Sequence, residues 1–216
     1  MNKKLLTATA LLASSLAWTS GAYASAMTIT LSESGFTTAV FGPSATGAIS
    51  EGPIAYGTYL VNQISAQDAT SLGSPGVLNS NSIDISSITA GVLTVDVKST
   101  GLVGVNALMN FLSSFAVNSL NGSITHVTET TEINGTQVGT EAFSTLGTSI
   151  QNMKVNPGTA FTADDIFVIK DVGGGVGNDN LTIDLSATKV PEPASLALLG
   201  SALVGLGFLR RSRRTA

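Results

Sequence analysis

Apolar and polar residues alternate through most of the chain between residues 27 and 189. In the segment Leu93–Lys98, Leu and Val occupy every second position, and Thr, Asp and Lys fill the positions between them. Thr28–Leu31 and Leu181–Leu185 follow the same period of two. This period, with many Thr, Val and Ile residues, is typical of strands that bury one face. The pattern therefore predicts a body built from β-strands.

Pairs of Gly, Pro and Asn interrupt these segments at short intervals. Asn121-Gly122 and Asn134-Gly135 are pairs that favour two-residue hairpin turns, and they bracket a predicted strand over residues 123–133. Residues 111–120 read as a strand entering the first of these turns, although 105–116 also fit the spacing of a helix. No repeat of 20–50 residues is visible. Roughly ten short strands predict an all-β fold, an antiparallel two-sheet sandwich of jelly-roll-like type.

The N-terminal segment has the layout of a cleavable signal peptide. Lys3 and Lys4 precede an apolar run from Leu5 to Trp18, and small residues then occupy alternate positions in 22–26. A membrane anchor is the alternative, but a span needs roughly 20 apolar residues and this run is shorter. We expect signal peptidase to remove residues 1–26.

The C-terminal segment carries three elements in a fixed order. Pro191-Glu192-Pro193 is followed by residues 194–209, which contain no charge. The two prolines favour an extended backbone. The apolar stretch is somewhat shorter than a typical span, and we expect it to form a short transmembrane helix, with snorkelling arginine side chains and bilayer thinning making up the difference. The arginines would hold the end of this helix on the cytoplasmic side. These arginines are Arg210, Arg211, Arg213 and Arg214.

This arrangement, in a chain that also begins with a signal peptide, resembles the PEP-CTERM sorting signal, which is also catalogued with ice-binding-type proteins. The resemblance covers residues 190–216 and leaves 27–189 as the ectodomain. It implies an exported protein of a Gram-negative bacterium that is anchored transiently in the inner membrane. Exosortase, a membrane-embedded cysteine protease, would then process the tail and leave the protein at the cell surface or in the extracellular matrix. A plain tail anchor is the alternative.

Composition and charge exclude several classes of site and partner. The chain has no cysteine and a single histidine, so disulfides, thiolate metal sites and a cysteine nucleophile are absent. Residues 27–189 contain thirteen acidic and four basic residues. Such an acidic body repels phosphate groups, so we expect no nucleic-acid partner.

Candidate catalytic residues are few. His126 lies on a predicted strand, and neither Gly-x-Ser-x-Gly nor His-Glu-x-x-His occurs. Asp164-Asp165 and the set Glu129 and Glu132 are the only close carboxylate pairs, and residues three apart on a strand point to opposite faces. We interpret these acids as solvated charges and expect a protein that is not an enzyme. A glycoside hydrolase that uses carboxylates alone is the least favoured alternative.

A glycine-rich segment matches a calcium-binding repeat. Residues 174–182 fit the pattern G-G-x-G-x-D-x-U-x, but only one copy is present, whereas the motif binds calcium between stacked copies. A flexible glycine hairpin loop is the favoured interpretation. The alternative is a weak calcium site formed by Asp171, Gly175, Gly177 and Asp179, and no other cofactor is expected.

The sequence leaves two roles open for the ectodomain. We expect a structural or adhesive protein associated with exopolysaccharide. A polysaccharide- or ice-binding module is the alternative. Ice binding would be supported by flat threonine arrays, but within the ectodomain Thr-x-Thr occurs only in isolation, at 28–30 and 128–130. Aromatic residues that could stack on sugars are sparse, and Tyr56 and Tyr59 are the clearest candidates.

Overall fold

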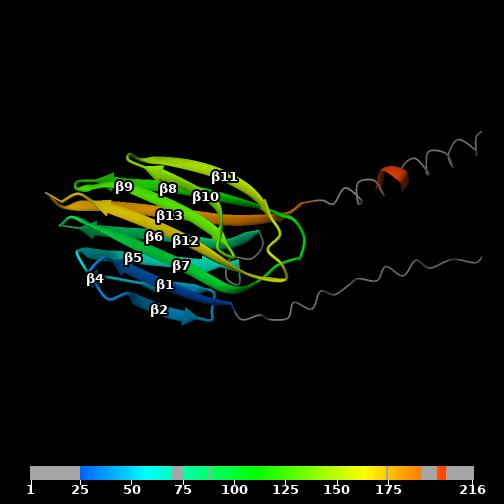
Figure 1. Cartoon of the computed structure of the whole chain (residues 1–216), viewed down its shortest axis with the longest axis horizontal. Coiled ribbons are helices and arrows are strands. Elements are labelled where there is room, and N and C mark those ends of the chain that lie inside the picture. Colours follow the sequence, from blue (N-terminus) through cyan, green and yellow to red (C-terminus); the bar gives the residue numbers. More distant parts are fainter. Residues whose placement is uncertain (1–24, 70–74, 88, 174, 191–198, 203–216) are drawn as a thin grey trace, which may run out of the picture.

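The computed structural model describes residues 25–69, 75–87, 89–173, 175–190 and 199–202, and nearly all of them form one β-sandwich (Figure 1). In chain order the strands are β1 (Ala26–Glu33), β2 (Ala39–Ser44), β3 (Ala48–Glu51), β4 (Ile54–Tyr56), β5 (Tyr59–Asp68), β6 (Gly76–Ser87), β7 (Gly91–Val103), β8 (Met109–Asn121), β9 (Ile124–Ile133), β10 (Thr136–Phe143), β11 (Gly147–Val155), β12 (Ala160–Asp171) and β13 (Gly177–Lys189).

The strands form two antiparallel sheets, which confirms the predicted all-β sandwich. The six-stranded sheet has the order β10-β9-β12-β7-β1-β2, and the seven-stranded sheet has the order β11-β8-β13-β6-β5-β3 with β4 also paired to β5. More strands are present than the roughly ten predicted. The difference arises at β2, β3 and β4, which are short, lie at sheet edges and largely lack alternating burial. Without an apolar face, such strands give no period-two signal.

The two Asn-Gly pairs form different connections. At Asn134-Gly135 both residues have positive φ, 52° and 73°, and the pair joins β9 to β10 as the predicted hairpin. Asn121-Gly122 instead carries the chain from β8 in one sheet to β9 in the other, so a hairpin there is wrong. Glycine is still required, because a Cβ at Gly122 would lie 1.9 Å from the Val176 carbonyl oxygen.

Residues 111–120 are in strand β8, as expected, and not in a helix. Their alternate residues point into the core, where the Phe111 ring meets the edge of Phe161 at 6.0 Å between centroids. The core is made by the inner faces of both sheets. Its largest fully buried side chains include Phe115, Phe167 and Met27. Burial of this apolar surface, at about 25 cal/mol per Å², stabilises the sandwich without disulfides.

The sandwich has two distinct ends. Strand β1 begins at Ala26 and β13 finishes at Lys189 at the same end, on the right in Figure 1, which we call the tail end. The opposite end, which we call the far end, carries the β4–β5 turn, the β6–β7 connection and the β12–β13 connection over residues 172–176. Segments far apart in the sequence therefore meet at the far end.

Candidate functional site

The predicted sorting segment begins where the sandwich stops. After β13 ends at Lys189, the Val190 N–H still donates to the Leu108 carbonyl oxygen (3.1 Å). Pro191, Glu192 and Pro193 follow directly and lie outside the described residues, as do the predicted signal peptide up to residue 24 and the arginines of 210–214. Of the predicted helix only residues 199–202 are described, and they are helical. Within the described ranges no helix is both long and apolar enough to cross a membrane.

The first half of the proposed calcium loop is held by hydrogen bonds within the protein. The Asp171 carboxylate accepts from the Ser123 hydroxyl (2.8 Å) and from the Gly173 N–H. The same Ser123 hydroxyl is 2.9 Å from the Gly175 carbonyl oxygen. The segment joins β12 of one sheet to β13 of the other, so it is a crossover and not the hairpin loop expected from the sequence.

The second half belongs to strand β13. Gly177 packs against β9, since a Cβ there would lie 2.6 Å from Ile124. Asp179 is fully buried, and its carboxylate accepts from the Ile85 N–H (3.2 Å). Across the described part of the chain, no group of three or more acidic or histidine side chains could hold a metal ion. Calcium binding at this loop therefore stays a prediction.

The carboxylate pairs are split between faces. Glu129 points into the core and Glu132 points outward, as a strand requires. Asp164 and Asp165 likewise point to opposite faces of β12. The expectation that these acids are solvated is wrong for Asp164, which is only 4% exposed. It is also wrong for Glu129 and Asp165, which are both fully buried. They occupy the apolar positions of their strands, so folding draws them inside with their neighbours.

The pKa values of the buried acids are strongly raised. Burial raises the pKa of Glu129 to about 8 and also raises the pKa values of Asp165 and Asp179 well above their usual range. Asp165 is bonded across the sandwich to the Ser80 hydroxyl (2.7 Å). Because neither Glu129 nor Asp165 reaches solvent, these two groups cannot act on a glycosidic bond of an external substrate.

Hydroxyl groups join the two sheets at further points. The Ser99 hydroxyl of β7 donates to Asp68 of β5 (2.7 Å), and Ser113 of β8 is bonded to Thr131 of β9 (2.5 Å). Buried polar groups that are paired in this way fix the alignment of the two sheets, because a shifted alignment would leave them without partners.

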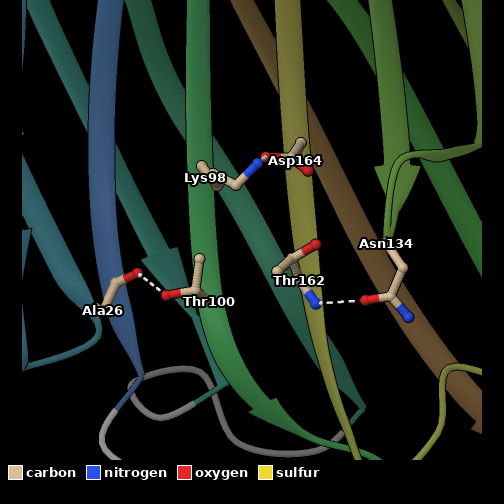
Figure 2. A network of polar contacts seen from close by, with 6 residues as sticks. All are labelled: Ala26, Lys98, Thr100, Asn134, Thr162 and Asp164. Atoms are coloured by element: carbon tan, nitrogen blue, oxygen red, sulfur yellow. Dashed lines mark hydrogen bonds and ion pairs between the residues drawn. The ribbon is translucent and has the colours of Figure 1, made fainter.

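Asp96, Lys98 and Asp164 form a charge cluster on the outer face of the six-stranded sheet. Figure 2 shows the pair Lys98 and Asp164. The Lys98 ammonium of β7 lies 2.9 Å from the Asp164 carboxylate of β12. Hydrogen bonding to Asp164 raises the pKa of Lys98. Burial, aided by the charge of Asp164, raises the pKa of Asp96 to about 6.

The same face holds both Thr-x-Thr segments, but they do not form one array. Thr30 of β1 and Thr130 of β9 stand in the same row across the sheet, separated by Asp96 and Ile166. An ordered ice-like water layer needs regular spacing, which charged and branched apolar residues interrupt. His126 lies on this sheet, exposed as expected, with Nδ1 3.0 Å from the Thr125 hydroxyl.

The two tyrosines are structural. Tyr59 is 3% exposed, its hydroxyl donates to the Ile169 carbonyl oxygen (3.3 Å), and burial raises its pKa to about 12. Tyr56 is 8% exposed and donates to the Thr37 carbonyl oxygen (3.1 Å). Neither ring offers a flat face to a sugar. Among the described residues, Phe36 is the exposed aromatic side chain.

A pocket of about 380 Å³ opens at the far end. Three segments form it: the β4–β5 turn with the start of β5, the end of β6 with Thr89, and the β12–β13 connection. Its lining residues are Gly57, Thr58, Tyr59, Leu60, Ser86, Ser87, Thr89 and Val176. The sequence alone did not indicate this pocket, because the segments that form its walls are distant in the chain. The sequence feature that could have pointed to the pocket is the group of hydroxyl residues within 86–89.

Comparison with known families places a sorting signal at the end of the chain. Residues 189–214 match the PEP-CTERM protein-sorting motif. This match confirms the resemblance drawn from Pro191-Glu192-Pro193, the apolar segment and the arginines. No curated protein matches the chain.

Solved structures similar to the chain are carbohydrate-binding modules. TmCBM61 in complex with β-1,4-galactotriose aligns over 59% of this chain and 82% of its own, at 8% identity and a TM-score of 0.28. The C-terminal CBM6 of LamC, a marine laminarinase from Zobellia galactanivorans, aligns over 63% and 98%, at 12% identity and a TM-score of 0.25.

A third similar structure is the CBM36-1 domain of a multidomain xylanase from the hindgut metagenome of Trinervitermes trinervoides. It aligns over 56% of this chain and 85% of its own, at 14% identity and a TM-score of 0.25. These identities and TM-scores are too low to transfer any functional residue to this chain.

Proposed function

We propose that this protein is an exported surface or extracellular-matrix protein of a Gram-negative bacterium, whose tail is processed by exosortase at the inner membrane. Its sandwich would act as a structural or adhesive component alongside exopolysaccharide. The observation that carries this proposal is the sorting motif over residues 189–214, which begins at the last residue of the last strand.

The position of β13 fits a chain that loses its tail. Strand β13 pairs with β6 on one side and β8 on the other, so it is an internal strand. A cut after Lys189 removes no strand and leaves no new sheet edge. The Pro-Glu-Pro segment that follows has two fixed φ angles and two prolines without N–H groups, so it suits recognition in an extended form.

Fractionation of tagged variants tests this proposal. With an epitope tag in the body, the wild-type protein should be found outside the inner membrane as a shortened form. The double variant Pro191→Ala, Pro193→Ala should still be exported but should remain at full length in the inner membrane. Pro75→Ala, at an exposed position in the body, is the matched control and should behave as wild type. Cutting and release of the double variant would contradict the proposal.

Polysaccharide binding is the second candidate, and the far-end pocket favours it. The pocket is lined by hydroxyl groups and contains no charged side chain. Ice binding has less support, because the charge cluster separates the two Thr-x-Thr segments.

A further inference from the structure

The far-end pocket has the size of a small ligand site. Its volume of about 380 Å³ lies within the range of roughly 300–1,000 Å³ that is usual for ligand pockets. One sugar ring, together with part of its neighbour, fits such a volume. Leu60 and Val176, 43% and 67% exposed, provide apolar walls that can contact the C–H groups of a ring.

Three hydroxyl groups of the pocket, those of Thr58, Ser86 and Ser87, already donate their protons to other groups of the protein. The Thr58 hydroxyl donates to Glu33 (2.6 Å), and the Ser87 hydroxyl lies within reach of the Thr58 and Thr89 carbonyl oxygens (3.2 and 2.9 Å). The Ser86 hydroxyl donates to the Leu60 carbonyl oxygen (3.4 Å). A hydroxyl has one proton and two lone pairs, so these groups are left mainly as acceptors. A ligand that complements them is rich in donors.

The charges around the pocket disfavour anionic ligands. None of the residues that line the pocket is basic, and the nearest carboxylate in this network is Glu33, directly behind Thr58. The ectodomain as a whole is acidic, with thirteen acidic and four basic residues in 27–189. Uronate, sulfate and phosphate groups are repelled from such a site. A neutral sugar is therefore favoured over an anionic one.

The pocket is also held rigidly. The Glu33 carboxylate accepts from both the N–H (2.9 Å) and the hydroxyl of Thr58, and so fixes the β4–β5 turn. Gly57 has a φ of 58°, and a Cβ there would lie 1.7 Å from the Glu33 carboxylate, so a side chain at this position would displace that carboxylate from Thr58. A preformed site loses less entropy when a ligand binds.

The pocket lies at the far end, whereas the tail leaves from the tail end (Figure 1). A chain held at the membrane through its tail would therefore present the pocket away from the bilayer. We propose that the far-end pocket binds a sugar unit of a neutral polysaccharide. This inference rests on the proposed function, because it names the class of polymer with which the surface protein would associate.

Titration calorimetry on the full chain tests the inference, in a detergent without a sugar headgroup. The probes are cellohexaose, maltohexaose and laminarihexaose as neutral oligosaccharides, and a mannuronate hexamer as the anionic one. At least one neutral probe should bind, and the anionic probe should bind at least about tenfold more weakly. Leu60→Asp should weaken neutral binding by about tenfold or more, because it replaces an apolar wall with a charge.

Leu112→Asp is the matched control, since Leu112 is 38% exposed on the outer face of the same sheet and outside the pocket. It should leave binding unchanged. Val176→Asp, with Val172→Asp as its control, provides an independent pair should Leu60→Asp fail to fold. Absence of binding by all neutral probes, equal or tighter binding of the anionic probe, or equal effects of a pocket variant and its control would overturn the inference. The fractionation test is independent of this result, so failure of the pocket and failure of the sorting proposal are distinguishable.

Discussion

Glu129, Asp165 and Asp179 place three carboxyl groups in the interior of the sandwich, fully buried. Their desolvation raises their pKa values and so favours the protonated, uncharged forms. The charge that the sequence assigns to the body is therefore larger than the charge that the folded protein carries. Each group also links the stability of the fold to pH.

The variant Glu129→Gln tests this linkage. The pKa of Glu129 rises from 4.5 to about 8 on folding, so between these values the folded protein holds a proton that the unfolded chain has lost. The free energy of unfolding then falls as pH rises through this window, and Asp165 and Asp179 act in the same direction. Glutamine stays neutral, so the variant should lose this share of the fall, on the order of 1–4 kcal/mol between pH 4.5 and 8.5.

Urea unfolding at the two pH values measures the effect. Comparing the same variant at both values cancels the cost of the new amide group. Glu132→Gln, on the outward face of the same strand, is the control and should leave the pH dependence close to that of wild type. A Glu129→Gln protein with an unaltered pH dependence would show that Glu129 is ionised in the core.

The burial of Glu129 and Asp165 could be predicted in part from the sequence. Glu129 stands between Val127, Thr131 and Ile133 at every second position, and Asp165 shares its register with Phe167 and Ile169. This common parity predicts burial, but a charged residue at an apolar position also fits a strand whose inner face is locally open. Only the position of the opposite sheet, which supplies Ser80 to Asp165, distinguishes the two cases.

At the scale of strands, the edge of the six-stranded sheet is closed by a side chain. Strand β10 forms this edge, and the N–H of Thr140 on it donates to the Gln151 side-chain oxygen (3.1 Å). The Gln151 amide nitrogen donates in turn to the Thr140 carbonyl oxygen. The amide of Gln151 thus pairs with β10 as another strand would. Free edges of this kind otherwise template association between chains.

Gln151→Ala should open this edge. Loss of two hydrogen bonds to the Thr140 backbone should lower the free energy of unfolding by about 1–2 kcal/mol and should promote self-association. Asn152→Ala, an exposed neighbour on the other face of β11, should change neither property. Urea unfolding and light scattering after gel filtration measure both. An equally stable and monomeric Gln151→Ala protein would mean that the edge needs no cover.

Strands and local turns were predictable, while their assignment to sheets was not. Alternation predicted β1, β7 and β13 because each buries one face almost continuously. The same dipeptide, however, makes a hairpin at Asn134-Gly135 and a crossover at Asn121-Gly122. Local turn chemistry is the same at both sites, and the difference comes from strands distant in the chain that flank β8. The far-end pocket depends on the same long-range pairing, which explains why no motif revealed it.

For the whole molecule, the important relation is between the tail and the far end. Val190 and the tail-end residue Leu108 are joined by a hydrogen bond, whereas Val176 lies in the β12–β13 connection at the far end. If the tail holds the chain at the membrane before processing, the tail end faces the bilayer. A bulky reagent should then reach the far end faster than the tail end.

Single-thiol labelling tests this orientation, because the chain contains no cysteine of its own. The thiol is introduced by Val176→Cys or Leu108→Cys, at positions 67% and 46% exposed, in the Pro191→Ala, Pro193→Ala background that retains the tail. With a large PEG-maleimide, position 176 should react several times faster than position 108. In the processed wild-type background both should react at similar rates, as they should with N-ethylmaleimide in either background. Equal reaction with the large reagent in the retained protein would show that the sandwich lies free of the bilayer, so that its far end gains no preferential access to polymer outside the membrane.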